Sequence, residues 1–406
     1  MKITHRHRAL TGLVLGLLSL AAQASAQLYT FELITDTRSG FIDLGLFPSI
    51  NAAGTVAFRA ESAGSSGIFT GNGGGLTTVA DSSSSFADFG SLDPRINAAG
   101  TVAFFANLSS GGSGLFVNSA GVNSKIADTS DNFSTGDLFE AFGSPSLNAA
   151  GVVAFAAAAA SGDLGVFTGT AGGAPTRVGP ASTGTFSALA GRAFINENGA
   201  VAVVATTTGG DTQVLTALPP AEFSAAVATS GPLSSAIDTV TPYLTSDGLS
   251  VIILGTRETG ERGIFRVTGG VVTTLVDASG GFQDFNDFAL AADGSLLAFS
   301  AVTDDGRSGI FNGNDVVLNK VIATGDLIAF GVGLRQVDSL SFGDAGLNDS
   351  GQLSFYATFT DSLVPAEPGF AAVFRASPIP EPGSTALVLA GGGLLVLAWR
   401  RHSRSS

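Results

Sequence analysis

A short phrase returns seven times along this chain, and the repetition limits the possible folds more than any other feature. The copies at residues 50–58, 96–104 and 147–155 share the pattern Asn-Ala-Ala-Gly, then Thr or Val, then Val-Ala-Phe. The other four copies keep the glycine and vary more elsewhere: 195–203, 244–253, 290–299 and 347–355. Successive glycines are 46 to 57 residues apart, so the chain builds one structural unit per period.

Each period has the pattern of a small antiparallel sheet. Asn followed three positions later by Gly is typical of a type I turn, because the Asn side chain bonds the backbone ahead of it. The Val-Ala-Phe segment predicts a strand, as do a Gly-Ile-Phe segment such as 67–69 and a β-branched segment such as 77–81. The apolar residues before Asn predict a fourth strand. Four strands with their turns need about 40–50 residues, which matches the period.

The repeated units predict an all-β fold, namely a seven-bladed β-propeller of four-stranded blades. The last copy ends near residue 375 without a β-branched strand, and residues 30–36 resemble the missing strand. We therefore expect 30–36 to pair antiparallel with the last copy near Val373 and Phe374 and to close the ring. The alternative is an open stack or solenoid, whose end copies should look like polar caps.

The first 26 residues have the features of a secretory signal peptide. Basic residues at positions 2–8 precede an apolar stretch at 10–22, and Ala24-Ser25-Ala26 is a small-residue cleavage site that leaves Gln27 first. The alternative is a permanent first membrane anchor, for which the apolar stretch is short. The sequence therefore predicts export, with signal peptidase as a processing partner.

The C-terminal segment has three parts in a fixed order: Pro380-Glu381-Pro382, an uncharged run at 384–399, and three arginines within 400–404. This order resembles the PEP-CTERM sorting signal of proteins exported by Gram-negative, often biofilm-forming bacteria. The resemblance implies processing by the membrane protease exosortase. We expect 384–399 to form a short transmembrane helix that inserts transiently, with the arginines cytoplasmic, because a comfortable span needs ~20 residues. An ordinary C-terminal anchor is the alternative.

Between the two ends, the repeats resemble exported bacterial tandem-repeat proteins built on Asn-x-x-Gly-x-Val-Ala-Phe units. That resemblance implies an architecture and a destination, and it implies no activity. The expected organisation is a signal peptide at 1–26, a propeller domain at 27–377 and a sorting segment at 378–406. Copies four and five depart from the pattern, since Val203 and Ile253 stand where other copies have Phe.

The residue types present exclude several kinds of active site. The chain has no cysteine, and its three histidines stand at positions 5, 7 and 402, inside the two terminal segments. The propeller domain therefore has no thiol nucleophile, no Ser-His-Asp triad and only carboxylates to offer zinc. Residues 27–379 contain 32 acidic and 13 basic residues, a net charge of −19, which disfavours nucleic acid and anionic polysaccharide as partners.

Carboxylates could still act in pairs, as they do in glycoside hydrolysis. The candidate pairs are Asp304 with Asp305 and Asp284 with Asp287, which lie in polar, glycine-containing stretches. The alternative is that these residues are solvated acids of turns. An enzyme would instead bring two acids from different blades together at the mouth of the central channel.

Four aspartates share one repeat position at the end of the β-branched strand: Asp36, Asp81, Asp128 and Asp277. Equivalent positions of a propeller form a ring, so these carboxylates could hold calcium, which prefers oxygen ligands. The alternative is that each aspartate caps the turn after its strand, because no copy has a calcium-loop spacing. The sequence predicts no other cofactor or metal.

Together these features predict a non-enzymatic exported protein of the cell surface or extracellular matrix that is delivered by its sorting signal. Two alternatives stay open, a secreted carboxylate-based polysaccharide hydrolase or lyase and a calcium-stabilised binding module. The expected processing partners are signal peptidase and exosortase, and the sequence indicates no surface ligand.

Overall fold

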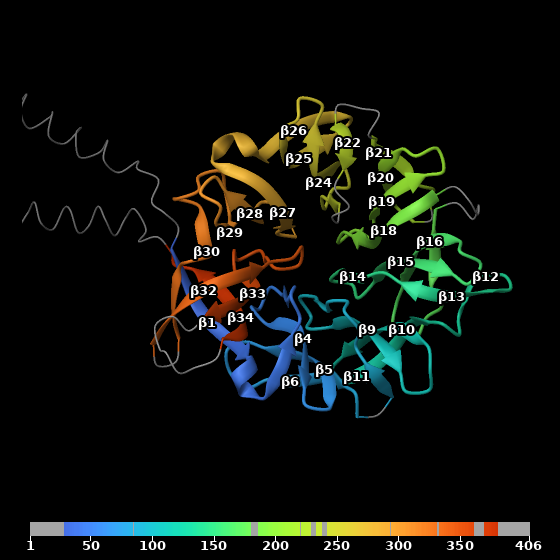
Figure 1. The fold of residues 1–406 in the computed structure, drawn as a ribbon. Coiled ribbons are helices and arrows are strands. Elements are labelled where there is room, and N and C mark those ends of the chain that lie inside the picture. Colours follow the sequence, from blue (N-terminus) through green and yellow to red (C-terminus); the bar gives the residue numbers. More distant parts are fainter. Residues whose placement is uncertain are drawn as a thin grey trace, which may run out of the picture.

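The computed structural model describes residues 28–83, 85–179, 186–219, 221–228, 233–237, 242–292, 294–330, 333–360 and 369–380. Seven small antiparallel sheets surround a central axis, so the predicted seven-bladed β-propeller is confirmed (Figure 1). The expected signal peptide and the apolar run at 384–399 lie outside the described residues. Within these residues, no helix is long and apolar enough to cross a membrane.

The first three blades follow the chain in order. Blade I contains β2 (Phe41–Leu44), β3 (Ser49–Ile50), β4 (Val56–Ser62), β5 (Ser65–Gly71) and β6 (Thr77–Asp81). Blade II contains β7 (Phe86–Asp88), β8 (Arg95–Ile96), β9 (Val102–Leu108), β10 (Ser113–Ser119) and β11 (Val122–Asp128). Blade III contains β12 (Asn132–Ser134), β13 (Asp137–Phe142), β14 (Ser146–Leu147), β15 (Val153–Ala159), β16 (Leu164–Gly169) and β17 (Thr176–Val178).

The next three blades keep the same plan. Blade IV contains β18 (Phe186–Ile195), β19 (Val201–Thr207), β20 (Thr212–Ala217) and β21 (Ser224–Ala228). Blade V contains β22 (Leu233–Ile237), β23 (Tyr243–Leu244), β24 (Ser250–Arg257), β25 (Arg262–Thr268) and β26 (Val271–Asp277). Blade VI contains β27 (Phe282–Leu290), β28 (Leu297–Thr303), β29 (Ser308–Phe311) and β30 (Lys320–Ala323).

Blade VII joins the two ends of the described chain. It contains β31 (Leu327–Phe330), β32 (Gly333–Ser341), β33 (Leu353–Thr360), β34 (Phe370–Pro378) and, at its outer edge, β1 (Tyr29–Asp36). Two 3₁₀ turns, η2 (Thr37–Ser39) and η3 (Ala278–Gly280), follow outermost strands and lead into the next blade.

In blades I to VI the strands run outward from the axis in chain order, and Figure 1 places β14, β18 and β27 near the axis. The turn with the repeat Asn follows the innermost strand and faces one side of the ring, which we call the Asn-turn face. The loops between third and fourth strands open on the same side, because neighbouring strands are antiparallel. The other loops open on what we call the opposite face.

The repeat asparagine has two roles, one in its own turn and one between blades. The Asn97 side-chain oxygen accepts a hydrogen bond from the Thr101 N–H at 3.0 Å, while its amide nitrogen donates to the Asn148 carbonyl of the next blade at 3.0 Å. Four other asparagines make the same donation to the turn of the next blade: Asn51, Asn148, Asn196 and Asn348. Thr245 and Ala291 replace Asn in blades V and VI. The Asn turns thus link most neighbouring blades near the axis.

The N-terminal strand closes the ring as expected. β1 pairs antiparallel with β34, with Leu33 opposite Phe374 and Thr35 opposite Val373. Beyond the last paired residues, the Ile379 N–H donates to the Leu28 carbonyl at 2.8 Å. The open-stack alternative is therefore wrong.

Phenylalanine fills the core of most blades. In blade II the rings of Phe104 and Phe116 stack with centroids 6.0 Å apart, and Phe86 packs edge-on against both. Blades IV and V still form sheets where the repeat departs from the pattern, because Val203 and Ile253 are buried in place of the phenylalanine.

Candidate functional site

Charged side chains converge near the axis from the innermost strands and the segments beside them. Four of them stand at one repeat position, four residues before the Asn turn begins: Asp93, Arg192, Asp287 and Asp344. Arg95 in β8 joins them, and we call these five residues the axial cluster. They come from blades II, IV, VI and VII, so only the closed ring brings them together.

Asp344 is the centre of the axial cluster. Its Oδ1 accepts a hydrogen bond from Arg95 Nη2 at 2.6 Å and another from Arg192 Nη1. The side chains of Arg95 and Asp344 are each 6% exposed. Tyr243 in β23 donates its hydroxyl to the backbone carbonyl of Asp344. Asp344 therefore ties blade VII to blades II, IV and V.

Burial and neighbouring charges shift the pKa of both arginines. Burial lowers the pKa of Arg95, and repulsion from Arg192 adds to this against the attraction of Asp344. Burial also acts to lower the pKa of Arg192, but the attraction of Asp344 and Asp287 outweighs it and raises the pKa overall. Guanidinium groups stay protonated in proteins, so the cluster keeps two positive charges.

Burial raises the pKa values of two acids of the axial cluster, Asp287 and Asp93. Burial, together with the negative charge of Asp344, raises the pKa of Asp287 to about 7, although Arg192 opposes the shift. Burial also raises the pKa of Asp93 against the attraction of Arg95 and Arg192. Asp287 is therefore divided between its neutral and charged forms near neutral pH.

Members of the axial cluster open on two different cavities. Arg95, Tyr243 and Asp344 line a cavity of about 170 Å³ beneath the Asn turns. Asp287 lines another cavity of about 280 Å³, together with Phe47. Nη1 of Arg95 is buried and has no hydrogen-bond partner among the described residues. The two carboxylates do not share one open chamber.

The predicted carboxylate pairs have different surroundings. Asp284 and Asp287 lie on β27, but Asp284 makes an ion pair with Arg262, whereas Asp287 joins the axial cluster. Asp304 and Asp305 lie in the turn between β28 and β29 on the opposite face. Asp305 accepts from the Thr303 hydroxyl within that turn. The turn-acid alternative therefore describes Asp304 and Asp305, and Asp287 meets acids of other blades instead of its predicted partner.

The aspartates of the predicted calcium ring lie at the opposite face, each at the end of an outermost strand. Asp128 accepts from the N–H and hydroxyl of Ser130 at 2.9 and 2.5 Å, and two others make the same turn: Asp81 and Asp277. Asp36 accepts from the Arg38 N–H at 2.9 Å. In the part of the chain that the structure describes, no group of three or more His, Cys, Asp or Glu could hold a metal. This geometry favours the capping alternative, and calcium binding stays a prediction.

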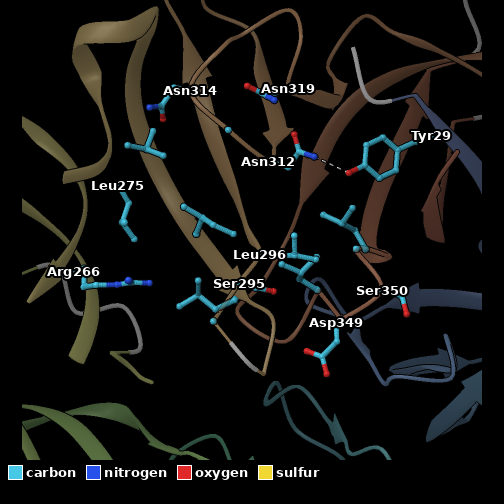
Figure 2. Close-up of a pocket in the computed structure, with 18 residues that line it drawn as sticks. Tyr29, Arg266, Leu275, Ser295, Leu296, Asn312, Asn314, Asn319, Asp349 and Ser350 are labelled. Atoms are coloured by element: carbon cyan, nitrogen blue, oxygen red, sulfur yellow. Dashed lines mark hydrogen bonds between the residues drawn. The ribbon is translucent and has the colours of Figure 1, made fainter. Parts of the chain in front are cut away.

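A larger cavity of about 600 Å³ opens on the Asn-turn face between blades V, VI and VII (Figure 2). Figure 2 shows Arg266 extending toward it from one side and Tyr29 from the other. The Tyr29 hydroxyl accepts from Asn312 Nδ2 at 3.0 Å, and burial raises the pKa of Tyr29 to about 12. Asp349 is the one acid among the described lining residues, so the cavity lacks a carboxylate pair for hydrolysis.

The motifs in the sequence did not point to Asp93, Arg95, Arg192 or Asp344. Alignment of the copies on the Asn turn would have found three of them, because that alignment places Asp93, Arg192 and Asp344 in one column with Asp287. Since this position precedes the turn nearest the axis in every blade, charges there must meet. Arg95 stands two residues after Asp93, and the residues at its position in the other copies are uncharged. The alignment of the copies therefore does not point to Arg95.

Comparisons with known proteins separate the propeller from the sorting segment. Residues 28–218 match a family described as "Family of unknown function (DUF7453)", and residues 378–402 match the PEP-CTERM protein-sorting motif. No curated protein matches the chain.

Solved structures resemble the propeller in shape. An oligogalacturonate lyase from Vibrio parahaemolyticus matches with a TM-score of 0.54 and 10% identity, over 89% of this chain and 99% of the lyase. A prolyl endopeptidase matches with a TM-score of 0.50 and 14% identity, over 88% of this chain and 52% of the peptidase. The chain thus spans about half the length of that peptidase. At these identities the likeness shows the fold alone, whereas the C-terminal match shows that the chain carries a PEP-CTERM sorting motif.

Proposed function

We propose that this protein is a non-enzymatic propeller of the cell surface or extracellular matrix, delivered there by signal peptidase and exosortase. The PEP-CTERM motif at 378–402 supports an exported, exosortase-sorted protein. In this proposal the apolar run at 384–399 holds the chain at the inner membrane until cleavage near Pro380-Glu381-Pro382. The propeller is the part that reaches the exterior.

The observation that carries the proposal is the position of both processing sites relative to the ring. β34 ends at Pro378, where the sorting motif begins, and β1 starts at Tyr29, just after the expected cleavage between Ala26 and Gln27. Cleavage at either site therefore removes no strand. The two strands that close blade VII stay paired, and the released product is a complete ring.

The axial cluster also supports a non-enzymatic role. Its central acid, Asp344, is buried against two guanidinium groups. A general acid or base must reach its substrate, whereas Asp344 is held by Arg95 and Arg192 and Asp287 opens on a different cavity. This arrangement suits a clamp between blades.

Mass spectrometry of the protein recovered from the cell surface tests the proposal. We expect peptides that start at Gln27 and end close to Pro380. A variant with Pro380→Ala and Pro382→Ala should stay in the membrane fraction and keep the peptide that contains Trp399. Surface protein that still contains Trp399 would contradict exosortase processing.

A carboxylate-based hydrolase or lyase is the second candidate function. One observation favours it, because acids from blades II, VI and VII meet near the axis, as an enzyme requires. The test is depolymerisation of polysaccharides by the purified protein and by Asp287→Asn, which preserves the shape of the side chain. Asp284→Asn on the same strand is the matched control. Turnover that only Asp287→Asn abolishes would establish the enzyme and overturn the first proposal.

A further inference from the structure

We propose that the Asn-turn face lies against the lipid bilayer while the C-terminal tail still holds the protein at the membrane. This inference rests on the proposed function, since it needs the tail to insert before cleavage. It adds a second contact, between the propeller and the lipid headgroup region, and it fixes which side of the ring faces the membrane.

The first observation is the position of exposed apolar side chains. In six of the seven blades, a large apolar side chain is exposed on a loop, strand end or chain end of the Asn-turn face: Leu76, Val122, Leu218, Val271, Val317 and Ile379. Their exposed fractions run from 36% to 71%. Apolar residues scattered singly over a surface need no explanation, but these recur on the same side of the ring, one in each of six blades.

The neighbours of these residues distinguish the two faces. None of the six has a charged residue beside it in the sequence. Exposed apolar residues of the opposite face do have one, since Asp43 follows Ile42, Asp137 precedes Leu138 and Asp326 precedes Leu327. An apolar side chain can enter the headgroup region only if its neighbours do not bring a charge with it. The six residues of the Asn-turn face meet that condition in sequence, although Asp315 accepts a hydrogen bond from the Val317 N–H.

The distribution of charge points the same way. In blades I to III the loops of the Asn-turn face contain no Asp, Glu, Lys or Arg, whereas the opposite side of these blades carries many acids, among them Asp43, Asp81, Asp88, Asp128, Asp137 and Asp163. Later blades do place acids on the Asn-turn face. Asp247 and Asp315 accept backbone N–H bonds there from Leu249 and Val317. In blades I to III, anionic lipid would therefore repel the opposite face more strongly than the Asn-turn face.

The position of the two chain ends indicates that the lipid bilayer is what covers the Asn-turn face. Leu28 and Ile379 both lie on the Asn-turn face, because β1 begins and β34 ends on this side of the ring. They lie beside the Asn turn of blade VII, since the Pro378 ring is 3.5 Å from the point where a Cβ added to Gly351 would stand. Residues 380–383 separate Ile379 from the apolar run at 384–399, and four residues reach at most about 14 Å. An inserted tail would therefore keep Ile379, and with it the edge of the Asn-turn face at blade VII, within that distance of the bilayer.

The contact between the propeller and the bilayer is expected to be weak and reversible. A single weak membrane signal gives marginal binding, and a second signal on the same chain makes the contact intramolecular. Cleavage near Pro382 would remove the tail and return the face to its own weak affinity. The propeller would then leave the membrane without any further step.

Single-cysteine probes on the full chain test the orientation, because the chain has no cysteine of its own. Leu218→Cys and Val317→Cys place a polarity-sensitive fluorophore on the Asn-turn face, and Ile42→Cys and Leu327→Cys place it at sites of similar exposure on the opposite face. Each protein is reconstituted into phosphatidylethanolamine–phosphatidylglycerol vesicles with or without brominated lipid. Trp399 is the only tryptophan, so its quenching reports insertion of the tail independently.

We expect Trp399 to be quenched, and emission from the two Asn-turn probes to rise about twofold or more and to be quenched by brominated lipid. The opposite-face probes should keep their emission in water. Quenched Trp399 with all four probes unchanged would overturn this inference and leave the proposed function standing. An unquenched Trp399 would contradict the insertion on which both depend. A rise without vesicles that grows with protein concentration would mean that a second copy covers the face, which also overturns the inference.

Discussion

A single buried carboxylate joins blades that lie far apart in the sequence. Asp344 receives two guanidinium groups and the Tyr243 hydroxyl, so one side chain and its backbone hold four blades at the axis. Removing one partner of a buried ion pair leaves the others desolvated and uncompensated.

We therefore expect Asp344→Asn to lower the free energy of unfolding by about 3–5 kcal/mol, because Arg95 and Arg192 lose their shared negative partner. Urea denaturation measures this loss. Asp305→Asn, in an exposed turn, is the control and should leave the midpoint of urea unfolding close to that of the wild type. Equal losses for the two variants would contradict the clamp.

The axial cluster also makes stability depend on pH. The pKa of Asp287 rises from 3.8 to about 7 on folding, so between these values the folded state binds the proton that the unfolded state has released. Stability contributed by neutral Asp287 is therefore lost as pH rises through this window. We expect the midpoint of urea unfolding to fall from pH 4.5 to pH 7.5 and the fall to shrink in Asp287→Asn. Asp284→Asn should keep the wild-type slope, and a wild-type slope in Asp287→Asn would contradict the assignment.

At the scale of elements, the repeat asparagine makes one hydrogen bond within its own turn and one to the next blade, and a substitution can separate the two. Asn97→Asp keeps an oxygen for the Thr101 N–H and loses the donor to the Asn148 carbonyl, whereas Asn97→Ala loses both. We expect Asn97→Ala to cost about 1–3 kcal/mol, since it leaves buried polar groups unpaired. Thermal unfolding should rank the alanine variant below the wild type.

The aspartate variant isolates the bond between blades. Its stability should fall below that of the wild type even though its own turn can form, because a carboxylate cannot donate to Asn148 and lies close to that carbonyl. An aspartate variant as stable as the wild type would mean that the turn alone explains the repeat asparagine.

The sequence predicted the strands of the propeller well and the buried charges near its axis poorly. The strands, the number of blades and the closing role of residues 30–36 followed from the repeat, because turn residues and alternating patterns act locally. The hairpin of β12 and β13 and the bulges near Asp284 and Asp287 did not, because register depends on the partner strand. The axial cluster was missed because its residues meet across blades, and a pair such as Asp284 and Asp287 that is close in sequence diverges on a bulged strand.

At the scale of the whole molecule, the closure of blade VII couples the two ends. We expect removal of residues 27–40 to lower the melting temperature of the entire domain, because β34 would lose its partner and the sheet would gain a free edge. The drop should exceed the ~2–4 °C that 1 kcal/mol produces in a domain of 150–250 residues. Calorimetry measures it.

Removal of residues 381–406 is the matched control, since these residues follow every described strand. That truncation should leave the melting temperature unchanged. A chain that lacks 27–40 and melts like the wild type would show that the seventh blade is stable without β1.

The closure also sets an order of events during secretion. A chain crosses the membrane from its N-terminus, so β1 emerges first and must wait, with an exposed edge, for nearly the whole domain before β34 follows. Contacts between residues so far apart in sequence form slowly. β34 becomes free only when the sorting segment directly behind it has reached the membrane. A prematurely terminated chain would lack both its last strand and its sorting motif. Only a chain that can complete the ring can therefore be recognised by the sorting protease.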